Sequence, residues 1–406
     1  MNQPANTGLD TGPNPNLDTA PDTRSNTSPN SSLDSGANPS SNPSHWVRDA
    51  KSMEAQLRAW LSRHVEAPQV RIDERSLATG MSSETVLFDY EWVQGGQRKR
   101  SGCVLRMPPL PGTRTLFPVY DLDRQQRIMR LIAERSSVPV PRIHWYEDDS
   151  QWLGAPFFVM ERREGLVPGD SPPYVFQSFL TEGTAEQVQL AEQETVRIIA
   201  DLHGIPLRAD DRALLDLTTE GDTPLRRHFD DLLQHYEWVC REEGFRSPLL
   251  ERAHRWLSDN WPENEGDQVV LWGDARVGNV MYQDYRPVAA FDWECATIGP
   301  PEYDVCWLVM FHGWMQDLAA RFGLPGMPGF LRLSNVVAAY EALTSRKLKN
   351  LEFYLVYANT RLGPIMQRSM MRAVQYGHAP MPESTEDLIT HRAGLEKLLA
   401  GETWPG

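Results

Sequence analysis

Three side chains between residues 271 and 293 have the types and spacing that phosphoryl transfer requires. Asp274 follows Gly273 in a turn, Asn279 comes five positions later, and Asp292 comes thirteen positions after that. A carboxylate can orient an attacking hydroxyl and accept its proton. Amide and carboxylate oxygens are hard donors of the kind that Mg²⁺ prefers. We therefore expect Asp274 to be the catalytic base, and Asn279 and Asp292 to hold a magnesium ion.

The order of these residues also matches a known catalytic loop. In protein kinases, H-R-D-x-x-x-x-N has the same Asp-to-Asn spacing, and a later Asp completes the metal site. Each residue has a structural alternative, because Asp274 is also a common turn residue, Asn279 could cap its own loop and Asp292 could pair with Arg276. The occurrence of all three at these offsets favours the chemical interpretation.

Asp304 stands in the first turn of an expected helix. We expect its carboxylate to accept hydrogen bonds from the backbone of the catalytic loop and to support the site together with Gly273 and Arg276. The alternative is an acidic residue that interacts with the helix dipole.

Composition limits the class of protein. The chain has 406 residues, of which 40% are hydrophobic and 23% charged, as is ordinary for a globular protein with a real core. Its net charge of −15 argues against nucleic-acid binding, which depends on Lys and Arg. Four scattered cysteines form no C-x-x-C pair, and no apolar run resembles a signal peptide or a membrane span. We expect a cytoplasmic protein that binds neither nucleic acid nor membrane.

The chain is expected to have three parts. Residues 1–44 are rich in Asn, Ser, Thr, Pro and Gly, and predict a disordered low-complexity tail. Residues 45–162 predict an N-terminal nucleotide-binding lobe with a helix from about residue 46, then three strands, a helix and two strands. Residues 163–406 predict a mostly helical lobe for catalysis and substrate binding. The order of the elements is typical of the two-lobed, α+β protein-kinase-like fold.

The expected elements come from periodicity. Strands are expected near 70–72, 85–88, 103–106, 142–145, 156–160, 269–271, 280–282 and 288–291. Helices are expected at 46–61, 121–134, 185–203, 225–241, 247–259, 302–321, 331–344, 351–376 and 384–399.

The block 268–310 resembles the H-G-D-x-x-x-x-N and D-W-E motifs of the aminoglycoside phosphotransferase (choline-kinase-like) superfamily. Further segments resemble a phosphotransferase branch that is related to the kinase-like module of some acyl-CoA dehydrogenases. They are residues 104–109, 138–141, 154–161 and 292–294. The resemblance covers about residues 70 to 400. It implies an ATP-dependent, Mg²⁺-dependent small-molecule kinase, with GTP as an alternative donor.

The resemblance also implies the nucleotide-binding positions. The turn containing Gly80, Ser82 and Ser83 would cover the phosphates, and residues 160–162 would form the hinge beside adenine. Arg106 would stand where related kinases have the phosphate-pairing cation. The hinge residues are Met160, Glu161 and Arg162.

Two positions depart from the family pattern. Trp272 replaces the usual His, at a position that is largely structural. Gln125 replaces the Glu that normally anchors the strand cation, so that Asp121, Asp123 or Glu134 would have to substitute. These departures leave open a catalytically weak, nucleotide-binding regulatory module.

The acceptor hydroxyl is the least determined feature. The acidic segment 182–222 could attract a polycationic aminoglycoside, although a solvated helix face followed by a loop explains it better. Another amino-alcohol or a sugar is a further alternative for the acceptor. Arg226 and a helical series of arginines favour an anionic substrate instead. The series is Arg361, Arg368 and Arg372 at spacing i, i+7, i+11, which share one helix face and could clamp the phosphates of a CoA-like substrate. We favour a hydroxyacyl-CoA, such as a 4-hydroxyacyl-CoA in acid catabolism, with a functional link to an acyl-CoA dehydrogenase or ligase.

Overall fold

The chain divides into two units, residues 1–44 and 45–406. The computed structural model describes residues 49–73 and 83–404, all of which belong to the second unit. The predicted tail, Gly80 and Ser82 lie outside the described residues.

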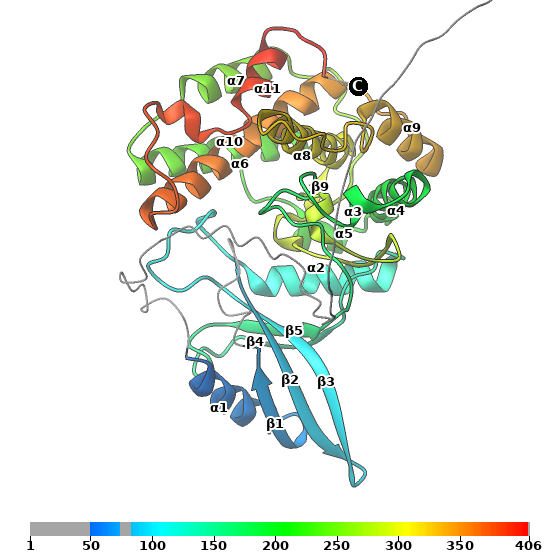
Figure 1. Ribbon diagram of the computed structural model, residues 1–406, viewed down its shortest axis with the longest axis vertical. Coiled ribbons are helices and arrows are strands. Elements are labelled where there is room, and N and C mark those ends of the chain that lie inside the picture. The colour runs from blue at the N-terminus through cyan, green and yellow to red at the C-terminus, as the bar shows by residue number, and fades with distance from the viewer. Residues whose placement is uncertain (1–48, 74–82, 405–406) are drawn as a thin grey trace, which may run out of the picture. The chain divides into compact units, whose positions relative to one another are not determined.

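An antiparallel sheet of five strands forms the N-terminal lobe (Figure 1). Its order is β1-β2-β3-β5-β4. The strands are β1 (Glu66–Ile72), β2 (Glu84–Gln94), β3 (Gln97–Met107), β4 (Ile143–Glu147) and β5 (Phe157–Glu161). Gly95 and Gly96 join β2 to β3 with φ of 59° and 76°, which is the left-handed conformation that a tight two-residue hairpin turn needs. The domain boundary predicted at 162 follows the end of β5 by one residue.

Two helices pack against this sheet. Helix α1 (Ala50–Leu61) begins at Asp49, whose side chain accepts from the Ser52 N–H at 2.7 Å, and it buries Leu57 and Trp60 in a core shared with β2, β3 and β5. Helix α2 (Leu122–Arg135) lies between the sheet and the helical lobe in Figure 1, and its apolar face joins the core of that second lobe.

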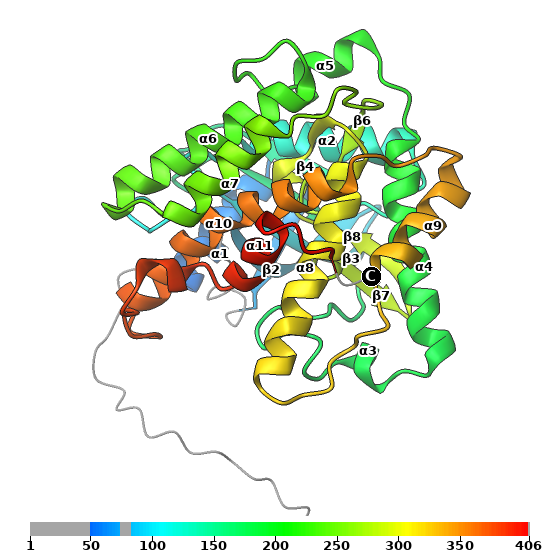
Figure 2. The ribbon, with the colours of Figure 1, turned by 90° about the horizontal axis from the view of Figure 1, so that it is seen from above.

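The second lobe is mostly helical (Figure 2). Its helices are α3 (Phe179–Glu182), α4 (Ala185–His203), α5 (Ala209–Leu215), α6 (Pro224–Glu243), α7 (Pro248–Asp259), α8 (Glu302–Arg321), α9 (Leu333–Thr344), α10 (Leu351–Gln375) and α11 (Arg392–Leu399). Two short antiparallel strand pairs stand among them. They are β6 (Val269–Leu271) with β9 (Thr297–Gly299), and β7 (Val280–Gln283) with β8 (Arg286–Ala290).

Most of the expected elements are confirmed to within a few residues, but the single helix expected at 384–399 is wrong. A short 3₁₀ turn (Thr385–Leu388) precedes α11, because the chain between them turns to bury Ile389 and His391 against α10. His391 Nε2 donates to the Asn359 carbonyl at 2.8 Å, which fixes this break. Helices α3 and α5 and strand β9 were not anticipated. No helix among residues 49–73 and 83–404 combines the length and the apolar content that a membrane crossing needs.

Candidate active site

The turn after β6 presents Asp274. Gly273 has φ of 81°, and a Cβ added there would overlap the carbonyl of Cys295. A glycine is therefore required by both the backbone conformation and the space. The turn can form only because Gly273 lets two backbone segments approach.

Asp304 holds this turn from the first turn of α8. Its carboxylate accepts from the backbone N–H of Trp272 at 2.7 Å and from that of Gly273 at 2.9 Å. His203 Nε2 lies 3.1 Å from the same carboxylate, and His203 Nδ1 lies 2.9 Å from the Tyr340 hydroxyl. Burial lowers the pKa of His203, so the neutral ring donates from Nε2. Two backbone donors are thus satisfied by one buried carboxylate, the contact expected for Asp304.

Asp274 accepts hydrogen bonds on both of its carboxylate oxygens. Trp307 Nε1 donates to Oδ1 at 2.8 Å, while Asn279 Nδ2 and Arg276 Nε donate to Oδ2 at 2.7 and 3.0 Å. Burial is the largest single influence and acts to raise the pKa of Asp274, but the charges of Arg276 and Arg361 and the hydrogen bonds from Arg276 and Asn279 together outweigh it and hold this pKa below its usual value. Asp274 is therefore an ionised and well-oriented carboxylate.

The structure brings Asn279 and Asp292 next to each other. Asn279 ends a 3₁₀ turn before β7, Asp292 follows β8, and the two strands pair from Val280 opposite Ala290. The N–H of Phe291 donates to the Asn279 carbonyl at 2.8 Å, so Asp292 is one residue from that contact. Asp292 has φ of 56°, a left-handed conformation that is uncommon outside glycine.

Trp272, which stands where the motif usually has His, packs and hydrogen-bonds inside the protein. Its side chain is fully buried and stacks on Trp293 with 5.1 Å between ring centroids. Its indole N–H donates to the Phe291 carbonyl at 2.7 Å. Trp272 therefore joins the turn that carries Asp274 to the strand end that carries Asp292.

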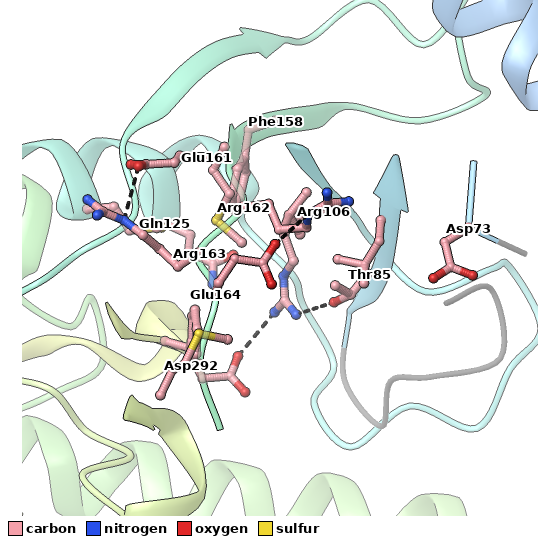
Figure 3. A pocket seen from close by; sticks show the side chains of 17 residues that line it. Asp73, Thr85, Arg106, Gln125, Phe158, Glu161, Arg162, Arg163, Glu164 and Asp292 are labelled. Atoms are coloured by element: carbon pink, nitrogen blue, oxygen red, sulfur yellow. Dashed lines mark hydrogen bonds and ion pairs between the residues drawn. The ribbon is translucent and has the colours of Figure 1, made fainter. Parts of the chain in front are cut away.

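Arg106 is anchored by a different acid from those considered above. It donates to Asp292 Oδ1 at 3.1 Å and to Thr85 Oγ1 at 2.7 Å (Figure 3). Asp121 instead caps α2 through the Arg124 N–H, and Asp123 accepts from Gln126 and Arg127. The expectation that Asp121, Asp123 or Glu134 would anchor Arg106 is corrected, because Asp292 lies directly opposite it across the cleft.

A pocket of about 500 Å³, here called the hinge pocket, lies between the sheet and the β7–β8 pair. Arg106 and Asp292 line one part of it, and the predicted hinge residues line another (Figure 3). Its apolar walls suit a planar base. They are formed by Leu87, Val104, Met129, Phe158, Met160 and Met281. The side chains of Glu161 and Arg162 are held by Arg163 at 3.1 Å and by Asp89 at 2.9 Å.

A second pocket of about 760 Å³, here called the helix pocket, lies among α2, α6 and α10. Gln125 lines both pockets, and the segment after Asp292 lines the helix pocket through Cys295 and Thr297. Ser83, predicted to cover nucleotide phosphates, is buried and lines the helix pocket rather than the hinge pocket.

The four predicted substrate arginines are not gathered into one clamp. Arg368 is buried and pairs with Glu243 at 2.7 Å, and Arg226 stacks on Trp261 at 3.5 Å. Arg372 lies 5.8 Å from the ring centroid of Tyr376. Only Arg361 lines the helix pocket. The i, i+7, i+11 spacing places three of these arginines along α10. The charge of Arg368, however, is neutralised by Glu243 of the neighbouring α6.

Three residues that hold the catalytic turn or helix α2 in place were not predicted from the sequence. Asp170, which forms an ion pair with Arg276, and Trp307 come from segments with no motif. Arg124 on α2 donates to the carbonyls of Leu214, Leu215 and Ala296 at 3.0, 3.1 and 2.7 Å. No local pattern marks an arginine that binds backbone carbonyls, so only the fold could reveal these contacts.

Comparison with known proteins identifies the class. A sequence profile of the phosphotransferase enzyme family (APH) matches residues 104–331. Human acyl-CoA dehydrogenase family member 11 is 25% identical over 333 residues, which cover 79% of this chain and 39% of the relative. The probable acyl-CoA dehydrogenase IBR3 of Arabidopsis thaliana is 25% identical over 301 residues, which cover 70% of this chain and 34% of that protein. The chain thus spans less than half the length of these relatives.

Solved structures share the fold. A Ralstonia eutropha protein assigned to the aminoglycoside phosphotransferases is 23% identical, with a TM-score of 0.57 over 85% of this chain and 96% of its own. The GDP complex of aminoglycoside 2'-phosphotransferase-IIIa is 12% identical, with a TM-score of 0.51 over 87% of this chain and 99% of its own. The expected two-lobed, α+β protein-kinase-like fold is confirmed.

The matched profile defines the class of the protein as a phosphotransferase. The chain belongs to the phosphotransferase enzyme family.

Proposed function

We propose that this enzyme transfers the γ-phosphoryl group of ATP to a hydroxyl of a small metabolite, most specifically a hydroxyacyl-CoA. The observation that carries the proposal is the convergence of Asp274, Asn279 and Asp292, of which Asp292 also lines the hinge pocket. The nucleotide base would lie against the apolar walls near residues 160–162, with the phosphates extending towards Arg106.

Asp274 would orient the acceptor hydroxyl and take its proton. Its lowered pKa keeps it ionised. The hydrogen bonds from Trp307 and Asn279 fix its direction. A carboxylate of low basicity suits a reaction in which positioning contributes more than proton abstraction. Gly273 and Asp304 would support this geometry.

Asn279 and Asp292 fit a magnesium site. Both hydrogen bonds of the Asn279 side chain to Asp274 use Nδ2, so its amide oxygen is not committed to Asp274. Asp292 has a side chain that is 26% exposed, and only Oδ1 contacts Arg106. No group of three His, Cys, Asp or Glu side chains that could hold a metal occurs in the described parts of the chain. This agrees with an ion held by two protein oxygens and the nucleotide phosphates, whose charge it would neutralise.

Arg106 would exchange Asp292 for the phosphates. In the structure its guanidinium is held by Thr85 and Asp292. Phosphate oxygens offer the bidentate geometry that arginine prefers. Releasing Asp292 from this pair would leave both of its oxygens for the metal.

The relatives and the placement of the acidic residues 182–222 both support a hydroxyacyl-CoA as the acceptor. Two relatives carry acyl-CoA dehydrogenase names, although the chain covers only part of each. In the acidic segment 182–222, Asp211 and Asp216 are paired with Arg135 and Arg227, and neither lines the helix pocket. None of the acidic residues of this segment lines the helix pocket, so none is placed to meet a polycationic aminoglycoside there.

The test is ADP release with hydroxyacyl-CoAs, aminoglycosides, choline-like amines and sugars, with GTP as a second donor. We expect a hydroxyacyl-CoA to give the highest kcat/KM. Asp274→Ala should lower turnover roughly 10²–10⁴-fold with nucleotide binding nearly intact. Undiminished turnover in Asp274→Ala would remove this residue from the mechanism, and ADP release with aminoglycosides alone would refute the hydroxyacyl-CoA assignment.

A further inference from the structure

The helix pocket is lined along two helices and by the segments between them. Its α6 lining extends from His228 to Arg241, and its α10 lining consists of Tyr357, Arg361 and Ile365 at helical spacing. The pocket therefore extends along α6.

Most polar side chains that line this pocket already form hydrogen bonds or ion pairs within the protein. His228 Nε2 donates to the Ile298 carbonyl at 3.0 Å, and His235 Nε2 donates to the Leu116 carbonyl at 3.0 Å. Burial lowers the pKa of both histidines to about 4, so both are neutral near pH 7. Arg124 is occupied by three carbonyls, and Glu237 pairs with Arg246 at 2.6 Å.

Three charged side chains that line the pocket lack such an ion-pair partner. Within the described residues, Asp231, Arg241 and Arg361 form no ion pair. Arg361 is half-buried; it donates to the Gly273 carbonyl at 2.6 Å and stacks on Trp307 at 4.3 Å from the ring centroid. The charge of Arg361 acts on Asp274, but within the described residues only its Nη1 makes a hydrogen bond, so the remaining N–H groups of this half-buried guanidinium can donate to a ligand oxygen.

The position of these charges gives the ligand a length and a direction. Arg361 lies beside Gly273, at the end of the pocket nearest the catalytic turn. Arg241 is exposed and lies ten positions after Asp231 on α6, which corresponds to about 15 Å along the helix axis. A compact sugar would not span this separation, whereas an extended chain would.

The walls between these ends are largely aromatic or aliphatic. They include Phe117, Tyr120, Trp238 and Tyr357, and the exposed Val119 stands at the lip. An apolar passage with charged groups at its two ends fits an amphiphilic ligand better than a polyhydroxylated or polycationic one.

We propose that the helix pocket binds the acceptor as an elongated, anionic acyl thioester. Arg361 donates to its carbonyl oxygen, Asp231 accepts a hydrogen bond from a hydroxyl or amide N–H, and Arg241 pairs with a phosphate of the distal tail. This assignment rests on the proposed function for the chemistry at Asp274. It adds the location of the acceptor and two specificity residues, Asp231 and Arg241.

The test is calorimetric binding of two probes to the full chain without nucleotide. One probe is a hydroxyacyl-CoA, and the other is the same hydroxyacyl group on N-acetylcysteamine, which lacks the phosphates. We expect the CoA thioester to bind more tightly, and Arg241→Gln to weaken it roughly two- to five-fold while leaving the short thioester unchanged. Arg361→Met should weaken both probes roughly ten- to hundred-fold.

The matched control is Arg252→Gln, because Arg252 is an exposed arginine on α7 outside the pocket lining. It should bind both probes as the wild type does. A CoA preference that survives in Arg241→Gln would overturn the inference. So would a wild type that binds neither thioester yet releases ADP with another alcohol, a result that would leave the phosphotransfer reaction itself intact.

Discussion

Replacing Asp304 by Asn should both destabilise the fold and misplace Asp274. The Asp304 carboxylate accepts from two backbone N–H groups at 2.7 and 2.9 Å and faces His203 Nε2 at 3.1 Å, with no exposed surface. An asparagine offers one oxygen and brings an NH₂ group against donors. At least one of the three donors therefore loses its acceptor.

The expected cost follows from these contacts. A lost hydrogen bond to a charged group costs about 1.5–3 kcal/mol, and a buried donor without an acceptor adds to this cost. We expect the free energy of unfolding to fall by about 2–4 kcal/mol, a large part of the ~5–15 kcal/mol that is typical of a folded domain. A shift of the turn by about 1 Å should lower kcat on the order of 10²-fold.

Urea unfolding followed by tryptophan fluorescence, together with steady-state kinetics, measures both effects. Asp317→Asn is the matched control, since Asp317 is exposed on the same helix, α8. Its stability should stay within about 0.5 kcal/mol of the wild type. If Asp304→Asn stays within the same limit, the buried carboxylate does not hold the catalytic turn and the reasoning fails.

Three further perturbations test other parts of the site and the fold. Asp292→Asn should reduce the enhancement of nucleotide binding by Mg²⁺ by roughly tenfold in calorimetry; an unchanged magnesium requirement would exclude it as a ligand. Gly273→Ala should lower the melting temperature and kcat, because its Cβ would overlap the Cys295 carbonyl, whereas Gly329→Ala, in open space, should change neither. Burial lowers the pKa of His254 to about 4, against 6.5 in the unfolded chain, so the unfolded state binds more protons between these values and stability falls as the pH falls. His254→Phe should recover about 2 kcal/mol at pH 5 and little at pH 8 in urea unfolding; an equal effect at both pH values would contradict this.

The periodic segments and the catalytic spacing were predictable because local physics determines them. Apolar residues at helical spacing gave α4 and α8 nearly to the residue, and alternating runs gave the strands of the sheet. The five positions from Asp274 to Asn279 span one turn and one 3₁₀ helix, which is a local geometry. The contact between Asn279 and Asp274 is therefore encoded within six residues.

The remaining features depend on distant segments that no local pattern connects. Arg106 and Asp292 are 186 positions apart, so their ion pair requires the relative placement of two lobes. Arg368 looked available on a helix face until α6 brought Glu243 against it. Asp170 carries no motif and reaches Arg276 only because the segment after β5 folds back over the catalytic turn. Long-range charge pairing was therefore the main source of error for the candidate site.

The three hydrogen bonds of Arg124 hold α2 against the second lobe. They oppose regulation by movement of this helix. In protein kinases, activity is controlled by repositioning the corresponding helix. Swinging α2 outward here would strip a partly buried guanidinium of three carbonyl acceptors, at a cost on the order of 5 kcal/mol. Such a state would be occupied by fewer than about one molecule in a thousand. Flux through the enzyme would then follow the concentrations of its two substrates and the amount of protein made, rather than an on–off transition of the catalyst.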